Sequence, residues 1–141
     1  MSIKIFYDKI EFRLKRSGEI KKFLEKVILA ENKLPGDLNF IFTNDKSLLE
    51  MNIRFLGHDY NTDVIAFDYH SEDKLNGEVY ISLETVEKNA AKYKVKKVEE
   101  VVRVMIHATL HLCGYSDANR EGKDRMFQRQ EKYLEELGRI V

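Results

Sequence analysis

Two histidines four residues apart are the side chains of this chain best placed to do chemistry; they lie in residues 107–117, HATLHLCGYSD. On an α-helix, side chains at i and i+4 share one face, so His107 and His111 can direct ring nitrogens toward one ion. Gly114 can end the helix in a left-handed turn, and Asp117 follows on the returning chain. Two imidazoles, one carboxylate and an open fourth position are typical of catalytic zinc. The spacing therefore predicts one Zn²⁺ per chain, held by His107, His111 and Asp117.

Ordinary packing is the alternative interpretation of the same residues. The histidines lie in an apolar segment, where two uncharged core histidines would need two separate hydrogen-bond partners, whereas a shared metal satisfies both. The alternative for Asp117 is the cap or turn residue before the last helix. Cys113 points about 200° away from His111 on a helix, so we interpret it as a small buried core residue.

The protease pattern H-E-x-x-H-x-x-G-x-x-H places metal ligands at these same offsets. Its general base is the glutamate after the first histidine, and here that position is Ala108. The substitution argues against peptide hydrolysis and leaves metal chemistry intact.

Length and composition are those of an ordinary single globular domain. The chain has 141 residues, of which 43% are hydrophobic and 34% charged. It has no apolar run long enough to span a membrane and no signal-peptide pattern at its start. A single cysteine permits no internal disulfide, and we expect a reduced, cytoplasmic protein.

The charges are balanced overall but unevenly distributed. Net charge is zero, which does not indicate a nucleic-acid binder by itself. Basic residues exceed acidic ones in residues 1–40 and 91–141, and acidic residues exceed basic ones between them. The two ends would make a basic face for RNA if they meet in space; the alternative is that the outer faces of the helices are simply charged.

The periodicity of apolar residues predicts an α+β chain in the order β-α-β-α-β-β-α-α-α. One sheet should be covered by helices, with the last three helices on one side. Pro35-Gly36 predicts a turn and Asn76-Gly77 the end of a polar loop. Ser17 is a candidate helix start, and Asn44 or Asp45 can cap the next helix. The expected strands are 3–7, 38–43, 64–69 and 78–83, and the expected helices are 17–34, 45–55, 84–94, 97–113 and 120–137.

The histidine stretch resembles the pattern H-G-x-L-H-L-x-G-Y-D-H of the YbeY-type rRNA maturation factors, a family of small bacterial zinc-dependent endoribonucleases. Residues 51–67, MNIRFLGHDYNTDVIAF, are similar to the family's L-N-x-x-Y-R-x-x-x-x-x-T-(D/N)-V-L-S-F, and residues 77–82, GEVYIS, to its G-(D/E)-I-x-I-S strand. The resemblance covers nearly the whole chain in order, and the histidine motif is its most specific part.

The resemblance implies a single domain, residues 1–141, with a small mixed β-sheet of about four strands packed with about five helices. It assigns the zinc ligands to His107, His111 and Asp117. It also implies cleavage of single-stranded RNA in maturation of the three-prime end of small-subunit rRNA, and a role in ribosome quality control. The implied partners are rRNA, the small ribosomal subunit and its associated proteins, in the cytoplasm and without a membrane. The oligomeric state does not follow from it.

Three positions depart from the family pattern. The third ligand is usually histidine and is Asp117 here; its oxygen is an acceptable zinc ligand. The family's arginine, expected to face the substrate phosphate, falls on Leu56, which cannot bind a phosphate; Arg54 points to another side of the same predicted helix, and His58 is an alternative. Ser116 replaces an aspartate that could accept a proton. No catalytic side chain beyond the metal ligands is therefore predicted.

Three functions are compatible with these residues. The first is a metal-dependent endoribonuclease, the second a ribosome-associated RNA-binding factor with a mainly structural zinc, and the third a metallohydrolase of another class. The candidate contacts to the RNA backbone are Arg103, Arg120, Lys123, Arg125 and Arg129, each of which is otherwise a solvated surface charge. The candidates for base stacking are Tyr60, Tyr69 and Tyr115, each of which is otherwise a packing residue.

Overall fold

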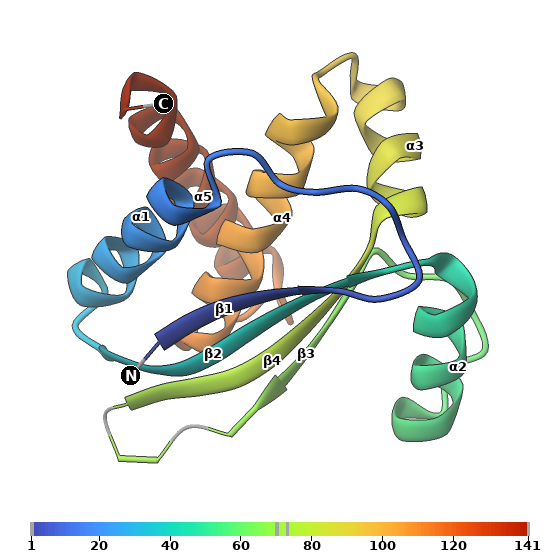
Figure 1. The fold of residues 1–141 in the computed structure, drawn as a ribbon. Helices are drawn as coiled ribbons and strands as arrows, with labels where there is room; N and C mark the ends of the chain where they lie inside the picture. Colours follow the sequence, from blue (N-terminus) through green and yellow to red (C-terminus); the bar gives the residue numbers. More distant parts are fainter. Residues whose placement is uncertain (1, 70, 73, 141) are drawn as a thin grey trace.

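The secondary structure follows the order expected from the sequence (Figure 1). The structure is a computed structural model that describes residues 2–69, 71–72 and 74–140. Its elements are β1 (Ser2–Tyr7), α1 (Ser17–Ala30), β2 (Leu34–Thr43), α2 (Asp45–Leu56), β3 (Val64–Asp68), β4 (Lys74–Ser82), α3 (Leu83–Tyr93), α4 (Lys97–Leu112) and α5 (Arg120–Ile140).

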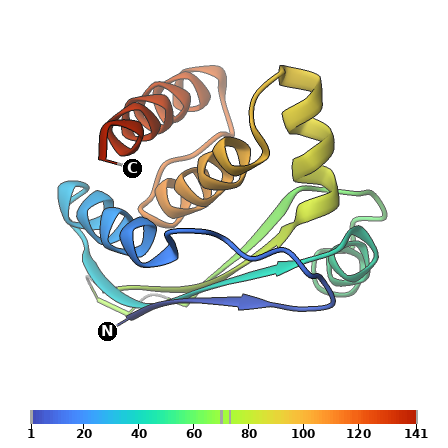
Figure 2. The same cartoon turned by 45° about the horizontal axis from the view of Figure 1, so that its top comes forward.

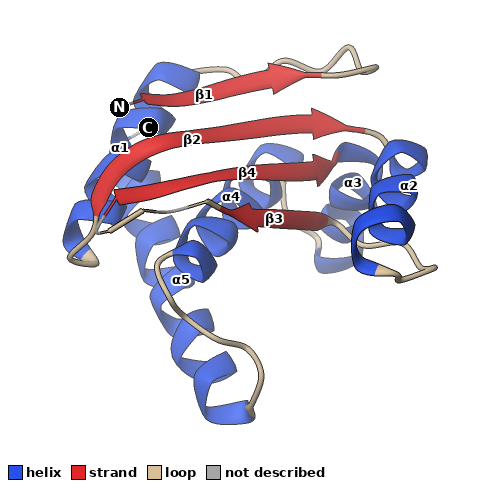
Figure 3. Cartoon of the chain, turned by 90° about the horizontal axis from the view of Figure 1, so that it is seen from below, coloured by secondary structure: helices blue, strands red, loops and turns tan. Residues whose placement is uncertain are grey.

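The four strands form one mixed sheet in the order β1-β2-β4-β3 (Figure 3). β1 and β2 are parallel, as are β2 and β4, whereas β3 is antiparallel to β4. β3 is an edge strand that pairs with β4, and it also contacts α4. The expectation of a small mixed sheet with five helices is confirmed.

The helices lie mainly over one face of the sheet. α1, α3 and α4 cover that face, and α5 packs on the outer side of α4 and α1 (Figure 2). Alternate residues of β2 point toward them, and Leu38, Phe40 and Phe42 are fully buried. α2 lies at the end of the sheet and contacts β3, β4 and α3. No helix in the described ranges has the length and apolarity needed to span a bilayer.

α4 is the central helix of the helical layer and carries both histidines. Its side chains are buried on most sides, including Val101, Met105, Ile106 and Leu110, each with no exposed surface. A helix that is apolar nearly all round belongs in a core, and each fully buried aliphatic side chain contributes about 1.5–3 kcal/mol. This packing gives His107 and His111 a rigid support.

Two local expectations, a turn at Pro35-Gly36 and a loop ending at Asn76-Gly77, were wrong for the same tertiary reason. Pro35 and Gly36 are not a turn but part of β2, where the register shifts between Pro35 and Leu38. A side chain at Gly36 would collide with the Asn76 amide, which accepts a hydrogen bond from the Asp37 N–H at 2.6 Å. Pairing with β4 therefore extends both strands into segments that read locally as turn and loop.

The boundaries of α1 also differ from the expectation. The helix ends at Ala30, so Leu34 belongs to β2 and not to the apolar stripe of the helix. Ser17 is the first helical residue, and the cap position is Arg16 in a left-handed conformation with φ of 58°. By contrast, α2 is capped by Asn44, one of the two residues predicted for that position, because its side-chain oxygen accepts from the Ser47 N–H at 2.8 Å.

Candidate functional site

The three predicted metal ligands line one pocket between α4 and β3. His107 and His111 stand one turn apart on α4, the first half-buried and the second exposed. They share a pocket of about 170 Å³ with Asp117 and with Val64 and Ala66 of β3, which lie on the helix-facing side of that strand. The residues that the spacing selected are therefore brought to one place.

The turn after α4 carries the chain back toward the histidines. Gly114 has φ of 112°, a left-handed conformation, and its N–H donates to the His111 carbonyl at 3.1 Å. The Tyr115 N–H donates to the Leu110 carbonyl at 3.1 Å, which closes the helix end. Gly114 thus ends the helix as the sequence predicted, and Asp117 follows on an exposed loop.

Asp117 is not the cap of α5. That position belongs to Asn119, whose side-chain oxygen accepts from the Gly122 N–H at 2.7 Å. The cap that the sequence left as an alternative for Asp117 is therefore provided by another residue, and the Asp117 carboxylate lines the histidine pocket.

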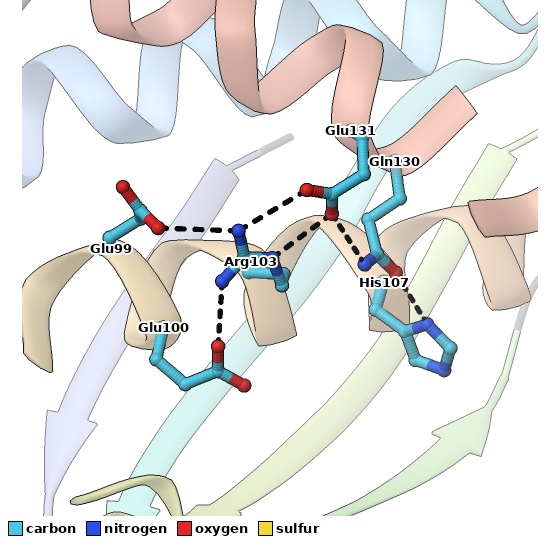
Figure 4. Close-up of polar contacts among 6 residues, drawn as sticks. All are labelled: Glu99, Glu100, Arg103, His107, Gln130 and Glu131. Atoms are coloured by element: carbon cyan, nitrogen blue, oxygen red, sulfur yellow. Dashed lines mark hydrogen bonds and ion pairs between the residues drawn. The ribbon is translucent and has the colours of Figure 1, made fainter. Parts of the chain in front are cut away.

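Gln130 on α5 determines which nitrogen of His107 carries the proton. The Gln130 Nε2 donates to Glu131 Oε2 at 3.0 Å, which orients the amide so that its Oε1 faces His107 Nδ1 at 2.7 Å (Figure 4). Because an amide oxygen only accepts, Nδ1 of the neutral ring must donate, and the lone pair is left on Nε2. A hydrogen bond of this kind behind a histidine is what orients metal-ligating imidazoles.

Arg103 holds the other end of this chain of contacts. Its guanidinium donates to Glu131 at 3.0 and 3.2 Å, to Glu100 at 2.7 Å and to Glu99 at 3.3 Å (Figure 4). Burial opposes its charge, but the bonds to Glu131 and Glu100 raise its pKa above the ordinary value. For Glu131, burial raises the pKa and the bonds from Arg103 and Gln130 lower it, with a net decrease. Arg103 is thus held by three carboxylates of the protein, and its contact to RNA stays a prediction.

Asp63, just before β3, is an acidic neighbour of the site that sequence reasoning did not select. Burial raises the pKa of its carboxyl, and the nearby charge of His107 partly opposes that rise. Its backbone carbonyl accepts from the Ser82 N–H at 2.9 Å, which ties the residue to the end of β4. Its signals in the sequence were its place before the apolar strand Val64–Asp68 and its match to the Asp or Asn of the family's T-(D/N)-V.

The donor set fits zinc in its chemistry. Two imidazoles one turn apart and a carboxylate share a pocket, and His107 presents Nε2 away from Gln130. Of the residues that the structure describes, no three His, Cys, Asp or Glu side chains are grouped closely enough to enclose an ion as they stand. Coordination by all three ligands therefore requires their side chains to move closer together than they stand here.

Cys113 belongs to the core, as the sequence indicated. It is partly buried against the hydrophobic cluster. Burial, with a further contribution from the charge of Glu31, raises the pKa of its thiol to about 12. A thiol that stays protonated is a poor metal ligand.

The residues around the missing arginine lie at the end of α2. This helix continues through Leu56, so Arg54 lies two residues earlier on the same helix, with its guanidinium 5.6 Å from the Phe55 ring centre. His58 stacks on Tyr60 at 5.1 Å and is exposed. Among the described residues that line the pocket of His107 and His111, none comes from this segment.

Two of the three tyrosines proposed for base stacking, Tyr69 and Tyr115, contact other side chains of the protein. Tyr69 stacks on Phe67 at 6.5 Å, and its hydroxyl donates to Glu78. The Tyr115 hydroxyl donates to Glu31 at 2.8 Å and accepts from Arg129 at 3.1 Å, so it is a packing residue between helices. Neither of them lines the histidine pocket within the described part of the chain.

A larger cavity, of about 640 Å³, lies at the opposite end of the α4–α5 pair. Its walls combine apolar side chains such as Phe12 and Val102 with the cations Arg13, Lys15 and Lys96. It contains no imidazole and one carboxylate, so it lacks the groups that acid–base or metal chemistry requires. The smaller histidine pocket is therefore the candidate site.

Comparison with known proteins agrees with the motifs. The family model for Endoribonuclease YbeY matches residues 4–138. Proteins named Endoribonuclease YbeY from Flavobacterium psychrophilum and Christiangramia forsetii are 42% and 38% identical, each covering 92% of this chain, which spans 92% and 90% of their lengths. The solution structure of a Thermotoga maritima protein is 33% identical, with a TM-score of 0.67, over 95% of this chain and 87% of that one. The chain belongs to the YbeY endoribonuclease family.

Proposed function

We propose that this protein is a zinc-dependent endoribonuclease that cleaves single-stranded RNA. Relatives over about nine-tenths of its length carry the name Endoribonuclease YbeY. The observation that carries the metal part is the pocket in which His107, His111 and Asp117 meet. A cytoplasmic role in maturation of the three-prime end of small-subunit rRNA, and in quality control on the ribosome with small-subunit proteins as partners, completes the proposal.

Each residue of the pocket has a distinct role in the proposed mechanism. His107 through Nε2, His111 and Asp117 would hold the ion, which supplies Lewis acidity and a water of lowered pKa when bound. Gln130 keeps the proton of His107 on Nδ1, away from the ion. Val64 and Ala66 form the apolar wall of the pocket on the side of β3.

Cations near the loop after α4 are suited to the RNA backbone. Arg125, Arg129 and Lys132 line a pocket beside Tyr115, next to the turn that positions Asp117. Arg129 is held by Glu31 at 3.3 Å and by the Tyr115 hydroxyl, so it is a fixed positive charge rather than a mobile one. Phosphate contacts of this kind would make RNA affinity fall steeply with salt.

The experiment that tests the proposal compares metal content with RNA cleavage. Untagged wild-type protein should contain about one zinc per chain, and His111→Ala and Asp117→Ala should lose most of it. Asp8→Ala is the matched control for Asp117→Ala, because both aspartates are exposed and Asp8 lies outside the pocket. Wild type and Asp8→Ala should cleave a single-stranded RNA but not its duplex, and a chelator should stop the cleavage. Wild-type protein that contains no metal, or RNA cleavage that continues in the presence of the chelator, would contradict the proposal.

A second function is favoured by one observation, the leucine at the position of the family's arginine. Leu56 is half-exposed at the end of α2 and offers no charge to a phosphate. A ribosome-associated RNA-binding factor with a structural zinc would need no such charge. It predicts RNA binding without cleavage, and unfolding when zinc is removed, in the same set of measurements.

A further inference from the structure

Phe127 is an exposed aromatic side chain on α5 beside the candidate metal site. Its side chain is 59% exposed, which is costly for a ring of this size in water. It lines a second pocket, of about 390 Å³, together with His107 and Asp117. Because these two residues also line the histidine pocket, the two pockets are neighbours that share a wall.

The position of Phe127 follows from the contact between α5 and α4. Lys123, Phe127 and Gln130 stand at i, i+4 and i+7, so they form one stripe of the helix. The last of them is hydrogen-bonded to His107 at 2.7 Å. Phe127 therefore lies one turn before the contact to the metal ligand, and Lys123 one turn further toward the start of α5.

The charges of this pocket favour a neutral group over a phosphate. Its charged residues are one cation, Lys123, and two carboxylates, Asp117 and Asp124. The rest of its lining includes the buried Met126 and the Phe127 ring. An anionic phosphate placed among these carboxylates would be repelled, whereas a flat, uncharged base gains by stacking on the ring. The volume is within the range of pockets that bind small organic ligands.

We propose that this pocket, the Phe127 pocket, binds a nucleobase of the RNA substrate by stacking on the Phe127 ring. The base belongs to a nucleotide next to the phosphate that faces His107 and His111. Lys123, at the rim, contacts the backbone of the same strand. This inference rests on the proposed function, because it takes the ligand of the neighbouring site to be RNA.

The stacking is tested with a single-stranded RNA that carries one 2-aminopurine, whose fluorescence is quenched when it stacks. Zinc-loaded wild-type protein should quench the probe at one position of the strand more than at the others. Phe127→Ala should lose that quenching and bind the RNA about tenfold more weakly, the loss expected for one stacked base. Phe127→Tyr should retain both, and Phe127→Leu, which is apolar without an aromatic face, should behave like the alanine variant.

The matched control is Tyr93→Ala. Tyr93 is 60% exposed on α3, almost the same exposure as Phe127, and lies outside the pocket. It should leave RNA affinity and quenching unchanged. Wild-type quenching and affinity in Phe127→Ala or Phe127→Leu, with wild type still binding RNA, would overturn the stacking proposal and leave the endoribonuclease proposal standing. That result would reassign the pocket to another occupant, such as a polypeptide. If wild-type protein binds no RNA at all, both proposals fail.

Discussion

The two histidines of the site are held in different ways. His107 is half-buried, and its Nδ1 hydrogen is directed at Gln130, which is itself only 6% exposed. His111 is exposed one turn later, at the end of α4. The orientation of the first imidazole is therefore determined before any ion arrives, and this preorganisation depends on a residue 23 positions away in the sequence.

Replacing Gln130 by methionine should weaken zinc binding by about 10–100-fold, because the side chain keeps its size and loses the acceptor that orients His107. Gln130→Glu keeps an acceptor and should lose less. The measurement is competition for zinc with a chromophoric chelator. Gln128→Met, an exposed position on the same helix, is the control and should bind zinc like wild type. Equal affinities in Gln130→Met and wild type would show that the hydrogen bond has no part in metal binding.

The contact between α4 and α5 both stabilises the fold and positions side chains of the candidate site. Arg103 on α4 bridges Glu100 on its own helix and Glu131 on α5. The Glu100 side chain is 7% exposed, so its charge is desolvated and depends on the guanidinium. The same contact positions Gln130 behind His107, which means that a loss of helix packing is also a loss of site geometry.

Arg103→Met should lower the free energy of unfolding by about 3 kcal/mol or more, because it leaves the buried Glu100 without its partner. Urea unfolding followed by circular dichroism measures the change. Arg125→Met is the control: its pair with Glu121 is 65% and 82% exposed, and such pairs contribute about 0–1 kcal/mol. A loss for Arg103→Met as small as that for Arg125→Met would contradict a buried charge network.

The cost of Arg103→Met should also depend on pH. The bonds from Arg103 and Gln130 outweigh burial and hold the pKa of folded Glu131 below its ordinary value of 4.5. A lowered carboxyl pKa stabilises the fold above the unfolded pKa, and that stability is lost as pH falls through the folded pKa. The stability difference between wild type and Arg103→Met should therefore be full at neutral pH and shrink below about pH 4.5. A difference that grows in acid would show the opposite linkage.

At the scale of the whole molecule, the candidate site joins the sheet to the helical layer. β3 supplies Val64 and Ala66, α4 supplies the histidines, and the loop before α5 supplies Asp117. An ion held by all of these groups would bind the folded chain and not the unfolded one. Metal binding should therefore be linked to global stability.

Zinc should raise the melting temperature of wild-type protein by several degrees, since a ligand at one hundred times its Kd adds about 2.7 kcal/mol. Scanning calorimetry with and without a chelator measures this shift. Asp117→Ala, which alters an exposed loop residue, should melt at the metal-free temperature of wild type and respond less to zinc. An equal response in both proteins would remove Asp117 from the ligand set.

The sequence by itself determined the element order, the helix that carries both histidines, its end at Gly114, and a cap of α2 at Asn44 or Asp45. These features depend on short-range periodicity and on local backbone preferences, which neighbouring residues express on their own. The gathering of His107, His111 and Asp117 in one pocket followed from the same local geometry, because only ten residues separate the first from the last.

Only the tertiary structure decided how distant residues serve the site. The sequence around Arg103 indicates a surface cation. In the structure its guanidinium is paired with Glu131, 28 residues away, because α5 packs on α4. Gln130 and Phe127 carry no local signal of function and acquire their places from that same packing. Pro35-Gly36 read as a turn and became strand, because pairing with β4 outweighs local preference. The physical reason is common to all four: the contacts join segments whose relative placement is set by burial of the core, which no short stretch of sequence contains.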